Sequence, residues 1–123
     1  KNPLDSVNCI VSKNDFLEMQ SKVQNVFVSD DMARYIVSLI LATRKHPLLS
    51  RGASPRATLS LTDMAKAVAF AEGRDYIVPR DVQNIFICTV NHRIILNAKA
   101  SASKKNSEEI LHEILRKTPK PRT

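Results

Sequence analysis

The chain has 123 residues, and its hydrophobic content of 43% fits one globular domain rather than a disordered segment. No apolar run approaches the roughly 18 residues of a membrane span, so we expect no membrane contact. Cys9 and Cys88 lie far apart and outside any Cys/His cluster, which excludes the usual zinc spacing and indicates two reduced, mostly buried thiols in a cytoplasmic protein.

Capping residues and apolar periodicity predict an all-α fold, a small bundle of five helices. We expect these, in chain order, at residues 13–25, 30–44, 54–72, 79–95 and 107–117, with Ser12 or Asn14, Ser54 and Ser107 as caps and Gly73 as a left-handed C-terminal cap. The expected inward positions are Phe16, Met19, Gln20, Val23, Met32, Ile36, Leu39, Ile40, Thr43, Ala57, Leu61, Met64, Ala65, Val68, Val82, Ile85, Phe86, Val90, Ile110, Leu111, Ile114 and Leu115.

Two short β-favouring segments precede the second and fourth helices: VFVSDD at 26–31 and YIVPRD at 76–81. They are predicted to pair as a short two-strand ribbon, or else to be extended linkers. The polar segment NAKASASKKN at 97–106 is predicted to be a linker. The expected organisation is therefore a core over residues 1–96, the linker at 97–106, a C-terminal helix of the same domain at 107–118, and a tail at 119–123.

The net charge of +7 is spread unevenly along the chain. Residues 99–123 hold seven Lys or Arg against three Glu, which is four of the seven net charges. A basic tail can contact nucleic acid or an acidic partner, or it can be solvated surface. No aromatic side chains alternate with its basic ones, which argues against a single-stranded nucleic acid as partner.

Other polar residues indicate structural rather than catalytic roles. No Cys, Ser or carboxylate has a catalytic spacing to His46, His92 or His112, and we expect structural or surface roles for these and for Arg93. The charged residues within 74–81 are expected to form local salt bridges, each worth less than about 1 kcal/mol.

The stretch RGASPRA at 51–57 has an unusual charge pattern. Ser54 and Pro55 are typical of a helix start, whose unpaired N–H groups attract anions. Arg56 instead places a cation on the first turn, which makes sense if an external anion such as a phosphate binds there. Gly52 would let the loop turn sharply or let that ligand approach the backbone. The alternative is an exposed arginine without a ligand.

Several motifs give the chain a family resemblance. GASPRA, with TR at 43–44, GRDYIVPRDV at 73–82 and HRI at 92–94, resembles the C-terminal lid of MoxR-family AAA+ ATPases over residues 2–121. The resemblance implies a helical AAA+ lid in which Arg56 is the sensor 2 residue that reaches the γ-phosphate of ATP, with Gly52, Ser54 and Pro55 beside the nucleotide. It further implies ATP and Mg²⁺ as cofactors of the full-length protein, an AAA+ core domain of the same chain as partner, a hexameric homo-oligomeric ring, and a client protein that the ring assembles or activates.

The chain lacks other parts of an ATPase. Its only glycines are Gly52 and Gly73, so it has no phosphate-binding loop, and no acidic pair follows an apolar strand to hold Mg²⁺. Because the chain begins at Lys1, we expect a fragment or processed product that binds no cofactor and hydrolyses no ATP by itself. The alternatives are a small basic helical module that binds nucleic acid and a protein-interaction domain without a nucleotide role.

Overall fold

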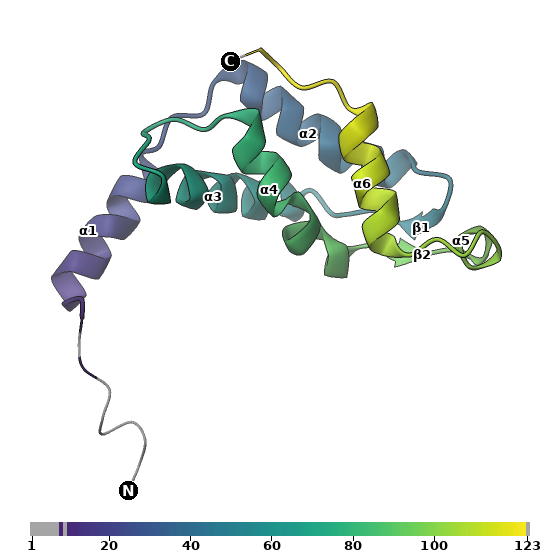
Figure 1. The fold of residues 1–123 in the computed structure, drawn as a ribbon, viewed down its shortest axis with the longest axis horizontal. Helices are drawn as coiled ribbons and strands as arrows, with labels where there is room; N and C mark the ends of the chain where they lie inside the picture. The colour runs from purple at the N-terminus through teal and green to yellow at the C-terminus, as the bar shows by residue number, and fades with distance from the viewer. Residues whose placement is uncertain (1–7, 9, 123) are drawn as a thin grey trace, which may run out of the picture.

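The computed structural model describes residue 8 and residues 10–122, and helices dominate this part of the chain (Figure 1). The elements are α1 (Lys13–Gln24), α2 (Asp30–Lys45), β1 (Leu49–Arg51), α3 (Arg56–Ala71), α4 (Pro79–Val90), the 3₁₀ turn η2 (Asn91–Arg93), β2 (Ile95–Leu96), α5 (Ala98–Ala102) and α6 (Ser107–Lys117). The predicted all-α class and the presence of a short two-strand ribbon are confirmed. None of the described helices combines the length and the apolar character needed to cross a membrane.

Helix α2 supplies one wall of the core. The Ser29 hydroxyl caps it by accepting a hydrogen bond from Met32 N at 3.2 Å, and two aspartates in the first turn and two basic residues in the last suit the helix dipole. Its predicted inward face is confirmed, with Tyr35 as an additional member. The buried residues are Met32, Tyr35, Ile36, Leu39, Ile40 and Thr43.

Helices α3 and α4 pack on each other and close the core from the other side (Figure 1). Gly73 joins them with a φ of +80°, and its N–H donates to Phe70 O at 2.9 Å, which confirms the predicted left-handed cap. Ala57, Ala65 and Ala69 of α3 and Phe86 of α4 are all fully buried in this core. Met64, expected inside, is 44% exposed, because the buried stripe runs through Ala65 and Ala69 instead.

The two-strand sheet forms between segments that were not predicted to pair. β1 and β2 run antiparallel, with Leu49 opposite Leu96, and β2 replaces the predicted end of the fourth helix, which stops at Val90. The predicted partners, 26–31 and 76–81, make a single parallel bridge between Phe27 and Tyr76. The chain leaves α4 early because its next residues pair with β1, a long-range contact that local helical periodicity does not reveal.

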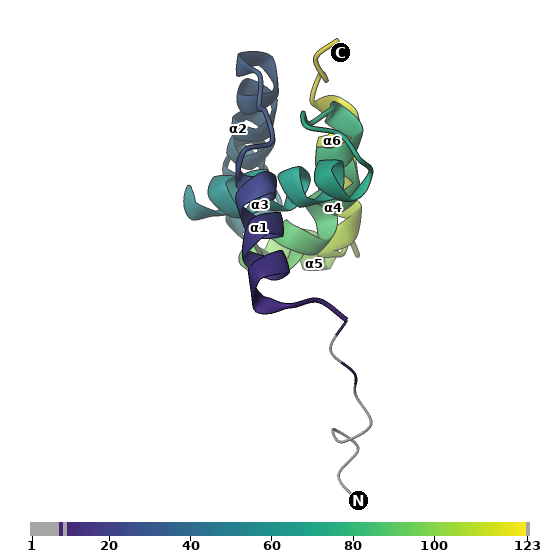
Figure 2. The ribbon, with the colours of Figure 1, turned by 90° about the vertical axis from the view of Figure 1, so that its left-hand side faces the viewer.

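Helix α1 forms where predicted but buries no side chain. Ser12 and Asp15 form a reciprocal capping box at its start. The expected inward face is wrong, since Phe16 is 53% exposed and Met19 is 38% exposed. The reason is its position at one end of the molecule (Figure 1), the end that faces the viewer in Figure 2, where it packs against α3.

The C-terminal part is more ordered than a polar linker implies. Within 97–106 the short helix α5 is capped by Asn97, whose Oδ1 accepts from Ala100 N at 3.1 Å. Asn106, rather than Ser107, caps α6 by accepting from Glu109 N at 2.9 Å. Helix α6 packs against α2 and α4. Its buried residues are Ile110, Leu111 and Ile114, as predicted, with Leu115 partly buried.

One ion pair within 74–81 has a buried member. Asp81, on the first turn of α4, is fully buried and accepts from Arg74 Nη1 at 2.7 Å, Arg74 Nη2 at 2.6 Å and Val78 N at 2.8 Å. Burial alone would raise the pKa of Asp81, but the hydrogen bonds from Arg74 and Val78 hold that pKa below its ordinary value. The predicted local salt bridge is confirmed, and the burial of Asp81 distinguishes it from the exposed pairs to which the value of less than about 1 kcal/mol applies.

Glu113 of α6 is the centre of a second charge cluster. Its carboxylate lies 2.8 Å from Lys117 Nζ, 3.4 Å from Lys105 Nζ and 3.5 Å from His46 Nε2. The hydrogen bond from Lys117, assisted by the charge of Lys105, lowers the pKa of Glu113 from 4.5 to about 2.

We expect stability to fall in acid because both carboxylates have lowered pKa values in the folded chain. A lowered native pKa means that the unfolded chain binds protons more readily, so the stabilisation present above about pH 4.5 is lost as the pH falls toward 2. Urea unfolding followed by circular dichroism between pH 7 and pH 2.5 measures this. Glu113→Gln should flatten the slope below pH 4.5, whereas the exposed Glu108→Gln should not; equal slopes for both variants would contradict the assignment.

Candidate functional site

The loop that leads from β1 into α3 is anchored on the end of α2. Thr43 is fully buried there, and its Oγ1 donates to Ile40 O at 2.6 Å and accepts from Ala53 N at 3.0 Å. Ala53 is also fully buried. The hydroxyl therefore ties the backbone of this loop to the last turn of the helix.

Gly52 lies directly against the same turn. A Cβ built on Gly52 would lie 2.5 Å from the Cα atom and 2.6 Å from the N atom of Arg44, and 2.6 Å from the carbonyl carbon of Thr43. These are backbone atoms and cannot rotate away as a side chain would. Gly52 is thus required for a close approach of the loop to the α2 backbone, a packing role that was not predicted from the sequence.

The start of α3 carries no side-chain cap. The helix begins at Arg56, and the predicted capping role of the Ser54 side chain is wrong. Pro55 already has helical backbone angles, so the first N–H groups are met by backbone: Ala57 N donates to Ser54 O at 2.9 Å and Thr58 N to Pro55 O at 3.0 Å. The first turn holds no acidic residue, and Arg56 is exposed on it.

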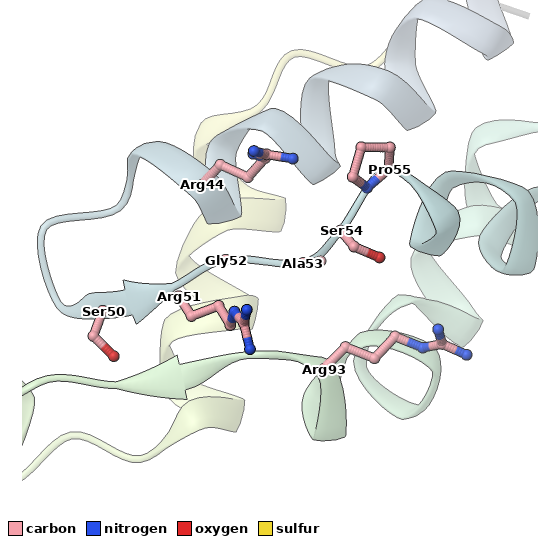
Figure 3. Close-up of a pocket in the computed structure, with 8 residues that line it drawn as sticks. All are labelled: Arg44, Ser50, Arg51, Gly52, Ala53, Ser54, Pro55 and Arg93. Atoms are coloured by element: carbon pink, nitrogen blue, oxygen red, sulfur yellow. The ribbon is translucent and has the colours of Figure 1, made fainter.

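A pocket of about 660 Å³ opens beside this loop (Figure 3). Arg56 does not line it, whereas Gly52, Ser54 and Pro55 do. In Figure 3 the loop passes between Arg44 on one side and Arg51 and Arg93 on the other. The full lining is Arg44, Ser50, Arg51, Gly52, Ala53, Ser54, Pro55 and Arg93.

Unpaired positive charge gathers at this end of the molecule. In the part of the chain that the structure describes, Arg34, Arg74 and Arg80 each contact a carboxylate, but the arginines of the pocket and Arg56 do not. Arg93 is held by a hydrogen bond from its Nε to Thr89 O at 3.1 Å. Sequence reasoning missed its place in the pocket, because residue 93 reaches the loop only through the pairing of β2 with β1. This surface can bind an anion.

The other candidate residues do not assemble a reactive centre. Cys88 is exposed, so its predicted burial is wrong, and Cys9 lies outside the described residues. His46 contacts the carboxylate of Glu113, which agrees with the structural or surface role expected for this histidine. Within residue 8 and residues 10–122, no three His, Cys, Asp or Glu side chains lie together in a way that could hold a metal ion.

Comparisons with known proteins agree on one family. The family described as "AAA lid domain" matches residues 41–114. The chain is 35% identical over 113 residues to the uncharacterized protein YeaC of Bacillus subtilis, covering 92% of this chain and 35% of YeaC. It is 32% identical over 121 residues to the chaperone MoxR1 of Mycobacterium tuberculosis, covering 91% of this chain and 32% of MoxR1.

A solved structure supports the same assignment. The crystal structure of a proposed ATPase from Cytophaga hutchinsonii matches with a TM-score of 0.87 and 38% identity, covering 94% of this chain and 38% of that one. The chain therefore spans about a third of the length of each of these three proteins.

Proposed function

Because this chain belongs to the AAA lid domain family, we propose that it acts as the C-terminal lid of a MoxR-type AAA+ ATPase and that Arg56 contacts the γ-phosphate of ATP bound to the core domain. The MoxR resemblance noted from the motifs is confirmed by the relatives MoxR1 and MoxR, the latter from Methylorubrum extorquens and 41% identical over 49 residues. A nucleic-acid-binding module is not favoured, since the AAA lid match at residues 41–114 includes α3, α4 and most of α6.

The observation that carries this proposal is the start of α3. Among the residues that the structure describes, Arg56 has no carboxylate partner, and it stands exposed on a helix N-terminus without a side-chain cap or an acidic residue. The dipole of α3 and the guanidinium favour the same ligand, an anion, and the planar guanidinium matches a phosphate with two parallel hydrogen bonds. Gly52, Ser54 and Pro55 would lie beside the nucleotide, in the wall of the neighbouring pocket.

The proposed mechanism divides the chemistry between two domains. The core domain of the same chain would hold ATP and Mg²⁺ and would position the attacking water, while the lid supplies one positive charge to the transferring phosphoryl group. When hydrolysis removes the γ-phosphate, Arg56 loses its contact and the lid can rotate relative to the core. In a cytoplasmic homo-oligomeric ring, such rotation would drive chaperone-like assembly or activation of a client protein.

We expect Arg56→Ala in the full-length protein to lower ATP turnover at least about ten-fold, because a charge-assisted contact in a dry site contributes a few kcal/mol to the transition state. Steady-state phosphate release measures it. Arg56→Lys should restore part of the rate, since an ammonium keeps the charge but loses the two-pronged geometry. The stability of the 123-residue chain should change by no more than about 0.5 kcal/mol, as for a typical surface substitution.

A matched control is Arg34→Ala, which removes another exposed arginine, 81% accessible, from α2. It should leave turnover unchanged. If Arg56→Ala hydrolyses ATP at the wild-type rate, the proposed role of Arg56 is wrong, and Arg51 is the next arginine to test.

A further inference from the structure

We infer that Thr43 is a positioning residue for Arg56. The Thr43 hydroxyl holds Arg56 in place through the backbone of the loop at 52–55. This inference rests on the proposed function of Arg56. Thr43 and Arg56 belong to different helices, and no direct contact between them is needed. The link is the hydrogen bond from Ala53 N to Thr43 Oγ1, three residues before Arg56.

The geometry makes Thr43 a fixed attachment point. Its hydroxyl donates its only proton to Ile40 O at 2.6 Å, so the lone pairs of Oγ1 remain for Ala53 N. Both bonds are buried, where loss of a partner leaves an N–H group without water to replace it. The Thr43 side chain is therefore held in one orientation, and the backbone amide of Ala53, which donates to it, is held as well.

Gly52 supplies the second constraint. It lies so close to the backbone of Thr43 and Arg44 that there is no room for even a Cβ atom between them, which limits movement of the loop toward α2. The hydrogen bond at Ala53 prevents movement in the opposite direction. Together they fix where α3 starts, and hence where the Cα atom of Arg56 lies relative to α2.

If Arg56 were displaced, it would keep its charge but would no longer stabilise the transition state of ATP hydrolysis. Transition-state contacts depend steeply on placement, and a shift of about 1 Å can cost on the order of a hundred-fold in rate. Thr43→Val keeps the side-chain shape and removes the hydroxyl. The start of α3 would then keep the close packing at Gly52 but lose the hydrogen bond at Ala53.

The test uses the full-length ATPase. We expect Thr43→Val to lower kcat about five-fold or more while the KM for ATP changes less than about two-fold, because the lost interaction acts mainly in the transition state. Thr43→Ser keeps the hydroxyl and should restore kcat to within about two-fold of wild type. Thr89→Val is the matched control: Thr89 is also buried, but its Oγ1 has no hydrogen-bond partner in the structure, so turnover should not change.

Coupling to Arg56 separates positioning from a general loss of stability. In the Thr43→Val/Arg56→Ala double variant, turnover should be no lower than in Arg56→Ala alone, since a misplaced arginine and a missing one are equivalent. If the two effects multiply, or if Thr43→Val has wild-type kcat while Arg56→Ala is slow, Thr43 is not a positioning residue and the role of Arg56 stands. If Arg56→Ala itself has wild-type turnover, the proposed function fails first.

Circular dichroism of each variant establishes that it is folded at the assay temperature. If Thr43→Val is not, Thr43→Cys takes its place, because a thiol has similar volume but is a weak donor and acceptor. Its kcat should lie between those of Thr43→Ser and Arg56→Ala. A folded Thr43→Cys with wild-type kcat and wild-type KM would overturn the inference.

Discussion

Gly52→Ala is expected to destabilise the chain by about 3 kcal/mol. The added Cβ would meet the Cα and N atoms of Arg44 and the carbonyl carbon of Thr43 at 2.5 to 2.6 Å. Overpacking of this kind typically costs about 1 to 3 kcal/mol, and the loop can relieve it only by moving away from α2. That movement breaks the hydrogen bond from Ala53 N to Thr43, which adds about 1 kcal/mol or more.

Urea unfolding of the 123-residue chain, followed by circular dichroism, measures this loss. Gly73→Ala is the informative control, because it separates crowding from backbone strain. Gly73 has a φ of +80°, but a Cβ added there would meet no atom within 4 Å, so alanine should cost only the left-handed penalty of about 1 to 2 kcal/mol. A larger loss at Gly73 than at Gly52 would contradict the close packing of the loop on α2.

Asp81→Ala should be the most damaging change to a charged residue, at about 3 kcal/mol or more. Asp81 is fully buried, and its removal leaves Arg74, whose side chain is only 19% exposed, without its main partner. Val78 N would also lose its acceptor at the start of α4. Removing one member of a buried pair is costly because the remaining group stays largely desolvated, and Arg74 would keep only its pairing with the more exposed Glu72.

Asp31→Ala provides the comparison for Asp81. Asp31 lies 3.9 Å from Arg34 in a pair whose side chains are 71% and 81% exposed, and such pairs contribute about 0 to 1 kcal/mol. Urea unfolding at pH 7 should therefore separate the two variants clearly. Equal midpoints would mean that the Arg74–Asp81 pair behaves as surface charge.

The sequence predicts elements well where the determining signal is local. The apolar period and the position of its start near Asp30 place α2 correctly, and Ile110, Leu111 and Ile114 identify the buried face of α6. The left-handed cap at Gly73 is predicted correctly for the same reason, because it depends only on a glycine that directly follows a helix.

Errors arise where a partner far away in the chain decides the structure. The apolar face of α1 is real, but periodicity does not say that a single helix, α3, lies beside it. β1 and β2 are too short to have a pattern of their own and exist because they pair with each other. Arg56 can be identified from the sequence alone, because it is a cation on the first turn of a helix. The requirement for Gly52 depends on how the loop packs against α2, and no local signal reveals that.

The attachment of the loop to Thr43 also has a consequence for the order in which the chain folds. The bond from Ala53 to Thr43 spans ten residues, whereas the hydroxyl of Ser50 reaches Ile95 across 45. Because less conformational entropy is lost, closing the shorter loop costs about 1.3 kcal/mol less free energy. During synthesis the end of α2 and the start of α3 can thus come together before the second strand leaves the ribosome, so the placement of Arg56 is encoded in the first half of the domain.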